Sequence, residues 1–393
     1  MAKLRVGVLF GGRSAEHEVS LVSAAAVLRA LDPEKYHVIP IGITKEGRWI
    51  LPRPLAEAAR TAPPATSLTH TDLRRALVDG QAVVLPAEAA DAALLPRQPA
   101  TAASPAPSPV RLDVIFPVLH GPFGEDGTVQ GLLELANIPY VGADVLGSAL
   151  GMDKEVQKRL FVQAGLPVTK YLSVRRHEWD ENPSGVQRAV RRRLRFPVFV
   201  KPAKLGSSVG ISKVRSAAAL SAAVKQAFQF DGKILVEQGI AGREIEVSVL
   251  GNHAPQASVP GEVIPARAFY DYTAKYLEDT TNFVIPAKLP PRQARRFQAL
   301  AVAAFRAIEC VGMARVDFLF ARRPGKIYLS EINTIPGFTP ISMYPKLWEA
   351  SGLPYSELLD RLLALALERH REKARTRFSL ELPAARRGGV LKE

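Results

Sequence analysis

An apolar run that ends in two glycines opens the sequence and limits the fold more than any other feature. Residues 4–10, LRVGVLF, precede the glycines, and a periodic apolar segment follows at 18–31. This order predicts a buried strand, a tight turn and a helix. A second buried run at 113–119 leads into another glycine-rich loop and a helix-like stretch near 128–136. We therefore expect an N-terminal open layer of parallel strands and helices, with ligands bound beyond the carboxyl ends of the strands.

The length of 393 residues allows two or three domains, and the order of strand and helix signals predicts a mixed α/β and α+β chain. We expect an N-terminal α/β domain at 1–142. Within it, ten prolines and many alanines at 52–110 favour a loop-rich, partly flexible insertion. Two α+β subdomains are expected at 143–232 and 233–370, and the basic residues 371–393 are expected to form a frayed, flexible tail.

The formal net charge of +14 raises the question whether the partner is a polyanion. Many of the excess arginines lie at 188–195, where Val186, Val190 and Leu194 recur at helical spacing. These arginines are therefore interpreted as the solvated face of an amphipathic helix. Aromatic side chains do not interleave with them as stacking platforms for bases would, so we expect no nucleic-acid partner.

The sequence contains a single cysteine, Cys310, which cannot form an intrachain disulfide and fits a reducing compartment. The N-terminal apolar run of about seven residues is too short and wrongly flanked for a signal peptide. No uncharged run approaches the ~18 residues that a membrane span needs. We therefore expect a cytoplasmic protein without a membrane partner.

Polar side chains alternate along two apolar segments in the C-terminal third of the chain. Arg315 and Asp317 share one face of a predicted strand, and Glu331 and Asn333 share one face of the next. If the two strands pair as a hairpin, three oxygen ligands and a guanidinium converge on one spot. Carboxylates with an amide oxygen suit magnesium that carries nucleotide phosphates rather than zinc. The alternative is a set of mutually satisfied polar residues on a wet sheet face.

Three further segments carry weaker signals. Residues 201–210, KPAKLGSSVG, form a glycine-serine turn whose backbone amides and lysines could hold an anion. Residues 237–240 end a strand that could pair with a flat heterocycle, and Glu244 follows as an acceptor for ribose hydroxyls. Glu16 and His17 lie at the first strand-to-helix turn, where an amine could bind. Taken singly, each segment also fits an ordinary turn or helix terminus.

These segments, in this order, resemble the ATP-grasp superfamily and, within it, the D-alanine:D-alanine ligases. The resemblance covers roughly 4–51 and 110–368. The strings that carry it are GGRSAEHEVSL, HGPFGEDGTVQGLLE, PYVGADVLGSALGMDK, VKPAKLGSSVG, VEQGIAGREIEVSVLG, YDYTAKY, ARVDFLF and EINTIPGFTPISMYPKLW. The resemblance implies an ATP-grasp fold behind an N-terminal open parallel-sheet (preATP-grasp) substrate domain, with 143–232 and 233–370 as its central and C-terminal subdomains. It implies ATP-dependent ligation of two D-alanine molecules to D-alanyl-D-alanine through an acyl phosphate, for peptidoglycan precursor synthesis and hence cell-wall biogenesis.

The resemblance also implies roles for individual residues. The ligands for two magnesium or manganese ions would be Asp317, Glu331 and Asn333. The residues that contact ATP would be Lys154, Lys201, Ser208, Glu237, Ile240, Glu244, Phe269 and Lys275. The two D-alanine molecules would contact Glu16, His120, Ser342 and Met343. The catalytic set would be Glu16, Ser207, Tyr276, Arg315 and the Gly337 amide. A homodimer and a bound monovalent cation are further expectations.

Three alternatives stay open at this point. A related ligase forms D-alanyl-D-lactate, and Tyr276 favours the dipeptide because the resemblance places there a tyrosine typical of the dipeptide-forming enzymes. Another ATP-grasp carboxylate–amine ligase could use different substrates. A noncatalytic nucleotide-binding or polyanion-binding protein is disfavoured by the complete set of predicted metal ligands beside Arg315.

Overall fold

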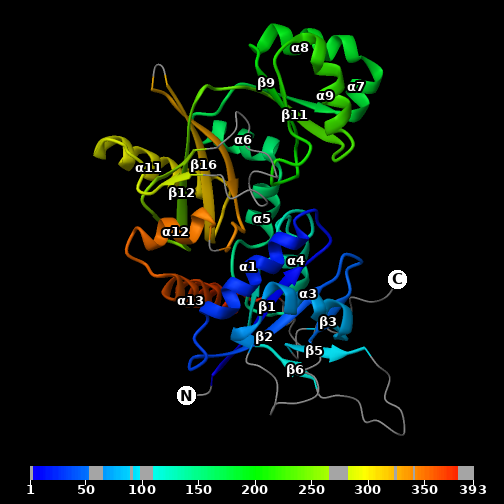
Figure 1. The fold of residues 1–393 in the computed structure, drawn as a ribbon, viewed down its shortest axis with the longest axis vertical. Coiled ribbons are helices and arrows are strands. Elements are labelled where there is room, and N and C mark those ends of the chain that lie inside the picture. Colours follow the sequence, from blue (N-terminus) through cyan, green and yellow to red (C-terminus); the bar gives the residue numbers. More distant parts are fainter. Residues whose placement is uncertain are drawn as a thin grey trace, which may run out of the picture.

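The computed structural model describes residues 3–52, 65–88, 92–97, 109–264, 282–322, 325–339 and 341–378. Among these residues the strands form three sheets, of seven, four and six strands (Figure 1). The seven-stranded sheet lies in the N-terminal part, and the four-stranded sheet lies at the opposite end of the molecule. No helix within the described ranges is both long and apolar enough to cross a membrane.

The N-terminal sheet is built around three parallel strands, as the buried runs predict. Its strands, in spatial order, are β6 (Val110–Arg111), β5 (Ala93–Pro96), β4 (Gln81–Val84), β3 (Trp49–Leu51), β2 (Tyr36–Ile43), β1 (Leu4–Gly11) and β7 (Val114–Pro117). β1 is parallel to β2 and to β7, and all its residues beyond the first two are buried. Helices α1 (His17–Ala30) and α4 (Thr128–Leu135) follow the two glycine-rich loops.

The insertion at 52–110 contributes more regular structure than its prolines suggest. Strands β4 and β5 lie within it and pair antiparallel with each other and with β3 and β6 at its borders, so the sheet is mixed and not purely parallel. Helix α3 (His70–Asp79) begins at Thr69, whose side chain forms a reciprocal capping box with Asp72. The expectation of a loop-rich segment was wrong for these parts, because short apolar pieces can extend a sheet edge even when prolines separate them.

The four-stranded sheet is antiparallel and carries helices on one side. Its strands, in spatial order, are β10 (Ser212–Val214), β9 (Val198–Pro202), β11 (Lys233–Gln238) and β8 (Tyr171–Arg175). Its helices are α7 (Arg176–Glu181), α8 (Pro183–Arg193) and α9 (Leu220–Ala227). Val190 of α8 and Leu194 are buried in this core, whereas the arginines of 188–195 are exposed, in agreement with the predicted amphipathic helix.

The structure moves one predicted boundary. β11 pairs with β8 and with β9, so the central sheet extends to Gln238 and the expected division at 232/233 cuts through it. The reason is that only three residues of β11, Ile234 to Val236, are apolar, although five of its six positions are buried, and so short a run does not reveal which neighbours it will pair with.

The six-stranded sheet carries the hairpin that the polar alternation predicts. Its strands are β15 (Asn282–Val284), β14 (Gly261–Ile264), β12 (Gly242–Gly251), β16 (Gly312–Ala321) and β17 (Ile327–Asn333), with β13 (Gln256–Ala257) paired to β12. Its helices are α11 (Pro291–Ala307) and α12 (Met343–Glu349). Helices α5 (Val145–Met152) and α6 (Lys154–Gln163) connect it to the other two sheets (Figure 1).

The C-terminal helix packs against the first strand and the first helix of the chain. α13 (Tyr355–Lys373) buries Leu358, Leu362 and Leu363 in the same apolar cluster as β1 and α1. The first residues of the expected basic tail, from 371 to 373, are therefore helical, while residues 379–393 lie outside the described ranges. This shared core holds the loop after β17 against the glycine-rich turns of the N-terminal sheet.

Candidate active site

The hairpin of β16 and β17 brings the predicted metal ligands together. In its register Arg315 lies opposite Asn333 and Asp317 lies opposite Glu331. The Arg315 guanidinium donates to both oxygens of Asp317, with each N···O distance 2.8 Å. Asn333 Nδ2 donates to Asp317 Oδ2 over 3.0 Å, which leaves its Oδ1 to act as a ligand. A second carboxylate, Glu246 on β12, lies 2.9 Å from Arg315 Nε.

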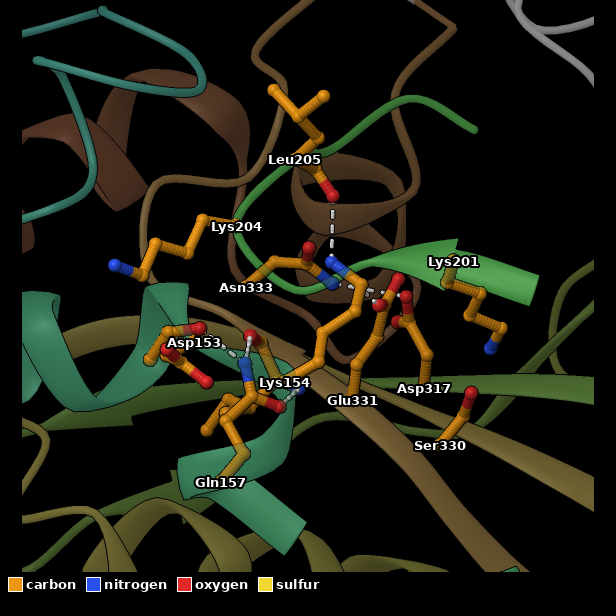
Figure 2. Close-up of polar contacts among 12 residues, drawn as sticks. Asp153, Lys154, Gln157, Lys201, Lys204, Leu205, Asp317, Ser330, Glu331 and Asn333 are labelled. Atoms are coloured by element: carbon orange, nitrogen blue, oxygen red, sulfur yellow. Dashed lines mark hydrogen bonds and ion pairs between the residues drawn. The ribbon is translucent and has the colours of Figure 1, made fainter. Parts of the chain in front are cut away.

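Lys154 links this hairpin to the glycine-serine loop, as Figure 2 shows. Its ammonium lies 3.3 Å from Glu331 Oε2 and donates to the Leu205 carbonyl over 2.7 Å. Lys154 begins helix α6, and Asp153 caps this helix by accepting from two backbone amides. The side chain of Lys204, although in the same loop, points away from the hairpin in Figure 2.

The donor set fits a hard divalent ion. Within the described ranges no three His, Cys, Asp or Glu side chains gather as they would at a zinc site. The hairpin instead offers the carboxylates of Asp317 and Glu331 and the amide oxygen of Asn333, all from oxygen-bearing side chains. Both carboxylates already lie beside protein cations, so an arriving ion exchanges with these cations and does not enter an uncompensated negative site.

A buried cluster of charged side chains lies at the end of the predicted ATP site where adenine is expected. Glu237 on β11 is 2% exposed, and its two oxygens lie 2.8 Å from Lys158 Nζ and 2.7 Å from Lys201 Nζ. Thr169 also donates to this carboxylate. Burial alone would raise the pKa of Glu237, but the two ammonium groups lower it well below the usual range. Ile240 is half-buried just past β11, and Glu244 lies on β12 opposite Leu319.

The predicted substrate end lies where the N-terminal turn meets the glycine-serine loop. Glu16, at the start of α1, is 7% exposed, and the Ser207 hydroxyl donates to its Oε1. A Cβ atom on Gly206 would lie only 2.9 Å from Glu16 Oε2, so a side chain there would push the loop away. Ser207 and Ser208 both adopt positive φ, of 50° and 60°. The loop is therefore closed over Glu16 in this structure.

His120 lies beside Glu16 and contacts the loop that follows β17. Its Nδ1 is 3.2 Å from the Ile335 carbonyl, and its Nε2 is 3.3 Å from Ser23 Oγ. Burial lowers the pKa of His120, against the opposing charge of Glu16. His17, in contrast, hydrogen-bonds within its own turn, to the Gly12 carbonyl.

Gly337 and Ser342 lie next to each other after β17. A Cβ atom on Gly337 would lie 2.6 Å from Ser342 Oγ, so a larger residue there would force the Ser342 hydroxyl to move. Ser342 Oγ in turn is 2.7 Å from Thr339 Oγ1. The Met343 side chain packs with Val263 and Leu347, which leaves only its backbone for a substrate. Phe269, Lys275 and Tyr276 lie outside the described residues.

Sequence reasoning missed two ionisable residues near the site, the buried Lys158 and the half-buried Glu125. Lys158 follows Lys154 by one helical turn, and this i, i+4 spacing was the signal that both face the site. Glu125, in the loop before α4, accepts hydrogen bonds from the backbone amides of Gly121 and Ile335. Burial, and next the charge of Glu16, raise the pKa of Glu125 to about 8. The dense polar string GEDG was the only hint in the sequence.

Comparisons with known proteins identify the family of the chain. Residues 5–143 match the family model described as D-ala D-ala ligase N-terminus, and residues 160–364 match the one described as D-ala D-ala ligase C-terminus. A D-alanine–D-alanine ligase of Geobacillus thermodenitrificans is 48% identical over 96% of this chain and 100% of its own length. One from Solibacter usitatus is 49% identical over 96% and 99%.

Solved structures give the same result at the level of the fold. The D-alanine-D-alanine ligase from Coxiella burnetii superposes with a TM-score of 0.79 at 38% identity, covering 95% of this chain and 97% of that one. The VanG D-Ala:D-Ser ligase from Enterococcus faecalis also superposes with a TM-score of 0.79, at 35% identity, covering 93% of this chain and 100% of that one. The fold is thus the ATP-grasp fold with an N-terminal α/β sheet. The chain belongs to the D-alanine–D-alanine ligase family.

Proposed function

We propose that the protein joins two D-alanine molecules to D-alanyl-D-alanine, with conversion of ATP to ADP and phosphate, in the supply of peptidoglycan precursors. The observation that carries this proposal is the meeting of three units at one place. The hairpin residue Glu331 contacts Lys154, Lys154 contacts the glycine-serine loop, and this loop contacts Glu16 through Ser207. A phosphate donor, its counter-ions and an amino-acid substrate therefore have adjoining places.

The reaction needs an activated carboxyl group, because a carboxylate is a poor electrophile. The first D-alanine attacks the γ-phosphate of ATP through its carboxylate, which gives an acyl phosphate and releases ADP. The amine of the second D-alanine then attacks the acyl carbon, phosphate leaves and the nitrogen loses a proton. Both steps build negative charge on oxygens, so fixed cations and backbone donors accelerate them.

The chain's own residues supply these groups. We assign Glu16, assisted by His120, to the ammonium of the first D-alanine and Ser342 to the carboxylate of the second, with the Met343 backbone beside it. Arg315 and the Gly337 amide stabilise the tetrahedral intermediate. Divalent ions, two Mg²⁺ or Mn²⁺, would be held by Asp317, Glu331 and Asn333 and would neutralise charge on the transferred phosphoryl group.

ATP is assigned to the junction of the four-stranded and six-stranded sheets, where Lys158 contacts both Glu237 and the Ser330 carbonyl. Lys154, Lys201 and Ser208 face its phosphates, together with Lys275. Glu237, Ile240 and Phe269 receive the adenine, and Glu244 receives the ribose. The closed position of the loop at Gly206 supports a lid that excludes water from the acyl phosphate, which hydrolyses readily.

The experiment is phosphate release from ATP and magnesium with a panel of second substrates. We expect release with D-alanine and little with L-alanine, and a dipeptide as the product. Because one structural relative is a D-Ala:D-Ser ligase, D-serine and D-lactate belong in the panel. Tyr276 leads us to expect the dipeptide over the ester at neutral pH. Predominant D-alanyl-D-lactate from an equimolar mixture would contradict this choice.

The finer expectations on assembly are part of the proposal. A homodimer is tested by light scattering of the purified protein, and a monovalent-ion requirement by activity in potassium against tetramethylammonium salts. Since the reaction consumes ATP, we place it in the cytoplasm.

A further inference from the structure

Lys158 is a buried cation that the reaction, as assigned above, does not use. Its side chain is 1% exposed on helix α6. Its ammonium donates to Glu237 Oε1 over 2.8 Å, to the Ser330 carbonyl over 3.1 Å and to Thr169 Oγ1 over 3.4 Å. A fully buried lysine is rare and costly unless it is paired, so a role for this charge is to be sought in its partners.

The two oxygens of Glu237 pair with two lysines that differ in how far they are exposed. Oε1 accepts hydrogen bonds from Lys158 and Thr169, and both residues are 1% exposed. Lys158 lies on α6, and Thr169 lies just before β8. Oε2 lies 2.7 Å from Lys201, whose side chain is 15% exposed at the end of β9, next to the glycine-serine loop. Lys158 is therefore fixed, whereas Lys201 can exchange the carboxylate for another anion.

The proposed function supplies that anion. When Lys201 turns to the phosphates of ATP, Glu237 Oε2 becomes available to the nucleobase. An ionised carboxylate only accepts hydrogen bonds. The 6-amino group of adenine donates one, but guanine presents a carbonyl oxygen at the same position. A buried site that is built to pair a donor rejects the analogue lacking it by as much as ~10⁴-fold.

We propose that Lys158 is a specificity-determining positioning residue that keeps Glu237 oriented and ionised as the acceptor for the 6-amino group of adenine once Lys201 has moved to the phosphates. The inference rests on the proposed function, because that function places the nucleotide here. Its physical basis is the balance at Glu237. Burial raises the pKa of this carboxyl and the two lysines lower it, so with both lysines gone the burial effect dominates.

The consequence is a specific loss of selectivity. A protonated Glu237 can donate a hydrogen bond through its hydroxyl, and guanine O6 can accept it. Removing Lys158 should therefore improve the use of GTP relative to ATP, beyond any general loss of activity. If the role of Lys158 were merely structural, its removal would lower kcat/KM for ATP and for GTP alike.

The test compares kcat/KM for ATP and GTP in the wild type and in Lys158→Met, with the melting temperature measured in parallel. We expect the ATP-over-GTP ratio to fall at least ~10-fold, a small part of the discrimination available to such a site. The matched control is Lys233→Met. Lys233 lies on the same strand as Glu237 and is also buried, but it pairs with Asp153 at 2.7 Å and Glu155 at 2.8 Å. Lys233→Met should lower stability and keep the ratio.

Two further variants keep the inference testable if Lys158→Met does not fold. Lys158→Arg retains the cation and should retain the ratio, whereas Glu237→Gln should lower it, since an amide both donates and accepts. An unchanged ratio in Lys158→Met or in Glu237→Gln would overturn the inference, and so would an equal fall in Lys233→Met. The affinities for ADP and GDP, measured by calorimetry, give the same ratio without turnover. Failure of wild-type ligation would thus be distinguished from failure of the base discrimination.

Discussion

The two ends of the proposed nucleotide site pair carboxylates with lysines in different ways. At the end that would hold the nucleobase, called the base end, the side chains of Lys158 and Glu237 are 1% and 3% exposed. At the metal end, Lys154 and Glu331 are 11% and 26% exposed. A buried pair loses much if one partner leaves, because the other charge is stranded in a poorly polarisable interior. A half-buried pair can exchange partners, since water compensates the change. The comparison teaches that one end is fixed for recognition and the other is open to ions and phosphates.

The largest expected effect is a loss of turnover when the metal end is changed. Glu331→Gln removes one anionic ligand, and we expect turnover to fall at least ~100-fold, the lower range for losing one preorganised electrostatic group. Phosphate release with D-alanine across a magnesium titration measures it. The control is Glu262→Gln, which removes a half-buried carboxylate of the same sheet that pairs with Arg243. Unaffected turnover in Glu331→Gln would remove the metal assignment and with it the contrast between the two ends.

The next effect separates Lys201 from its neighbour in the loop. Lys201→Met removes a charge-assisted contact to phosphate, and we expect KM for ATP to rise ~10-fold or more. Lys204→Met should leave KM close to the wild-type value, because its side chain points away from the hairpin (Figure 2). Steady-state kinetics with varied ATP measure both. Equal effects of the two variants would mean that Lys201 is not the exchangeable cation.

A smaller effect concerns the loop that follows Lys201 and contains Lys204. Residues 203–210 are closed over Glu16 in this structure, but they must open to admit a nucleotide. We expect their backbone amides to exchange with solvent and to gain protection when ADP and magnesium bind. Hydrogen exchange followed by mass spectrometry measures this, with α8 as the internal reference. Equal protection with and without ADP would show that the loop is not a lid.

The last effect is a pH dependence of stability and leaves the reaction itself untouched. Glu125 has a raised pKa of about 8 in the folded protein, so its folding contribution is fully present below the unfolded pKa near 4.5 and is lost as pH rises through about 8. We expect a loss of up to ~1.4 kcal/mol per pH unit across this window. Glu16→Gln removes the like charge and should flatten the decline. Urea unfolding from pH 5 to 9 measures both proteins, and identical slopes would contradict the assigned repulsion.

The sequence predicts the metal end far better than the base end. Alternation in ARVDFLF and IYLSEIN is a local pattern, and it predicts that Asp317 and Glu331 meet once the strands pair. The amphipathic pattern of α8 is local as well. Both predictions agree with the structure because each needs only the side-chain period of one element.

The base end depends on partners that no local pattern reveals. Lys158 donates to the Ser330 carbonyl, 172 residues away, and its burial follows from that contact and from β11. The sheet that β11 joins, and the strands within the proline-rich insertion, are likewise decided by pairing across the chain. Propensity and periodicity do not encode such pairings, so the strand pairing of β11 and the described parts of the insertion, 65–88 and 92–97, depart from what the sequence led us to expect.

The most direct test of the account is the stoichiometry of the wild-type reaction. The protein is incubated with ATP, magnesium and D-alanine, and ADP and D-alanyl-D-alanine are quantified together by chromatography and mass spectrometry. The account predicts one dipeptide for each ADP, and neither product when L-alanine replaces D-alanine. ADP formed without dipeptide, or a dipeptide formed equally well from L-alanine, would contradict it.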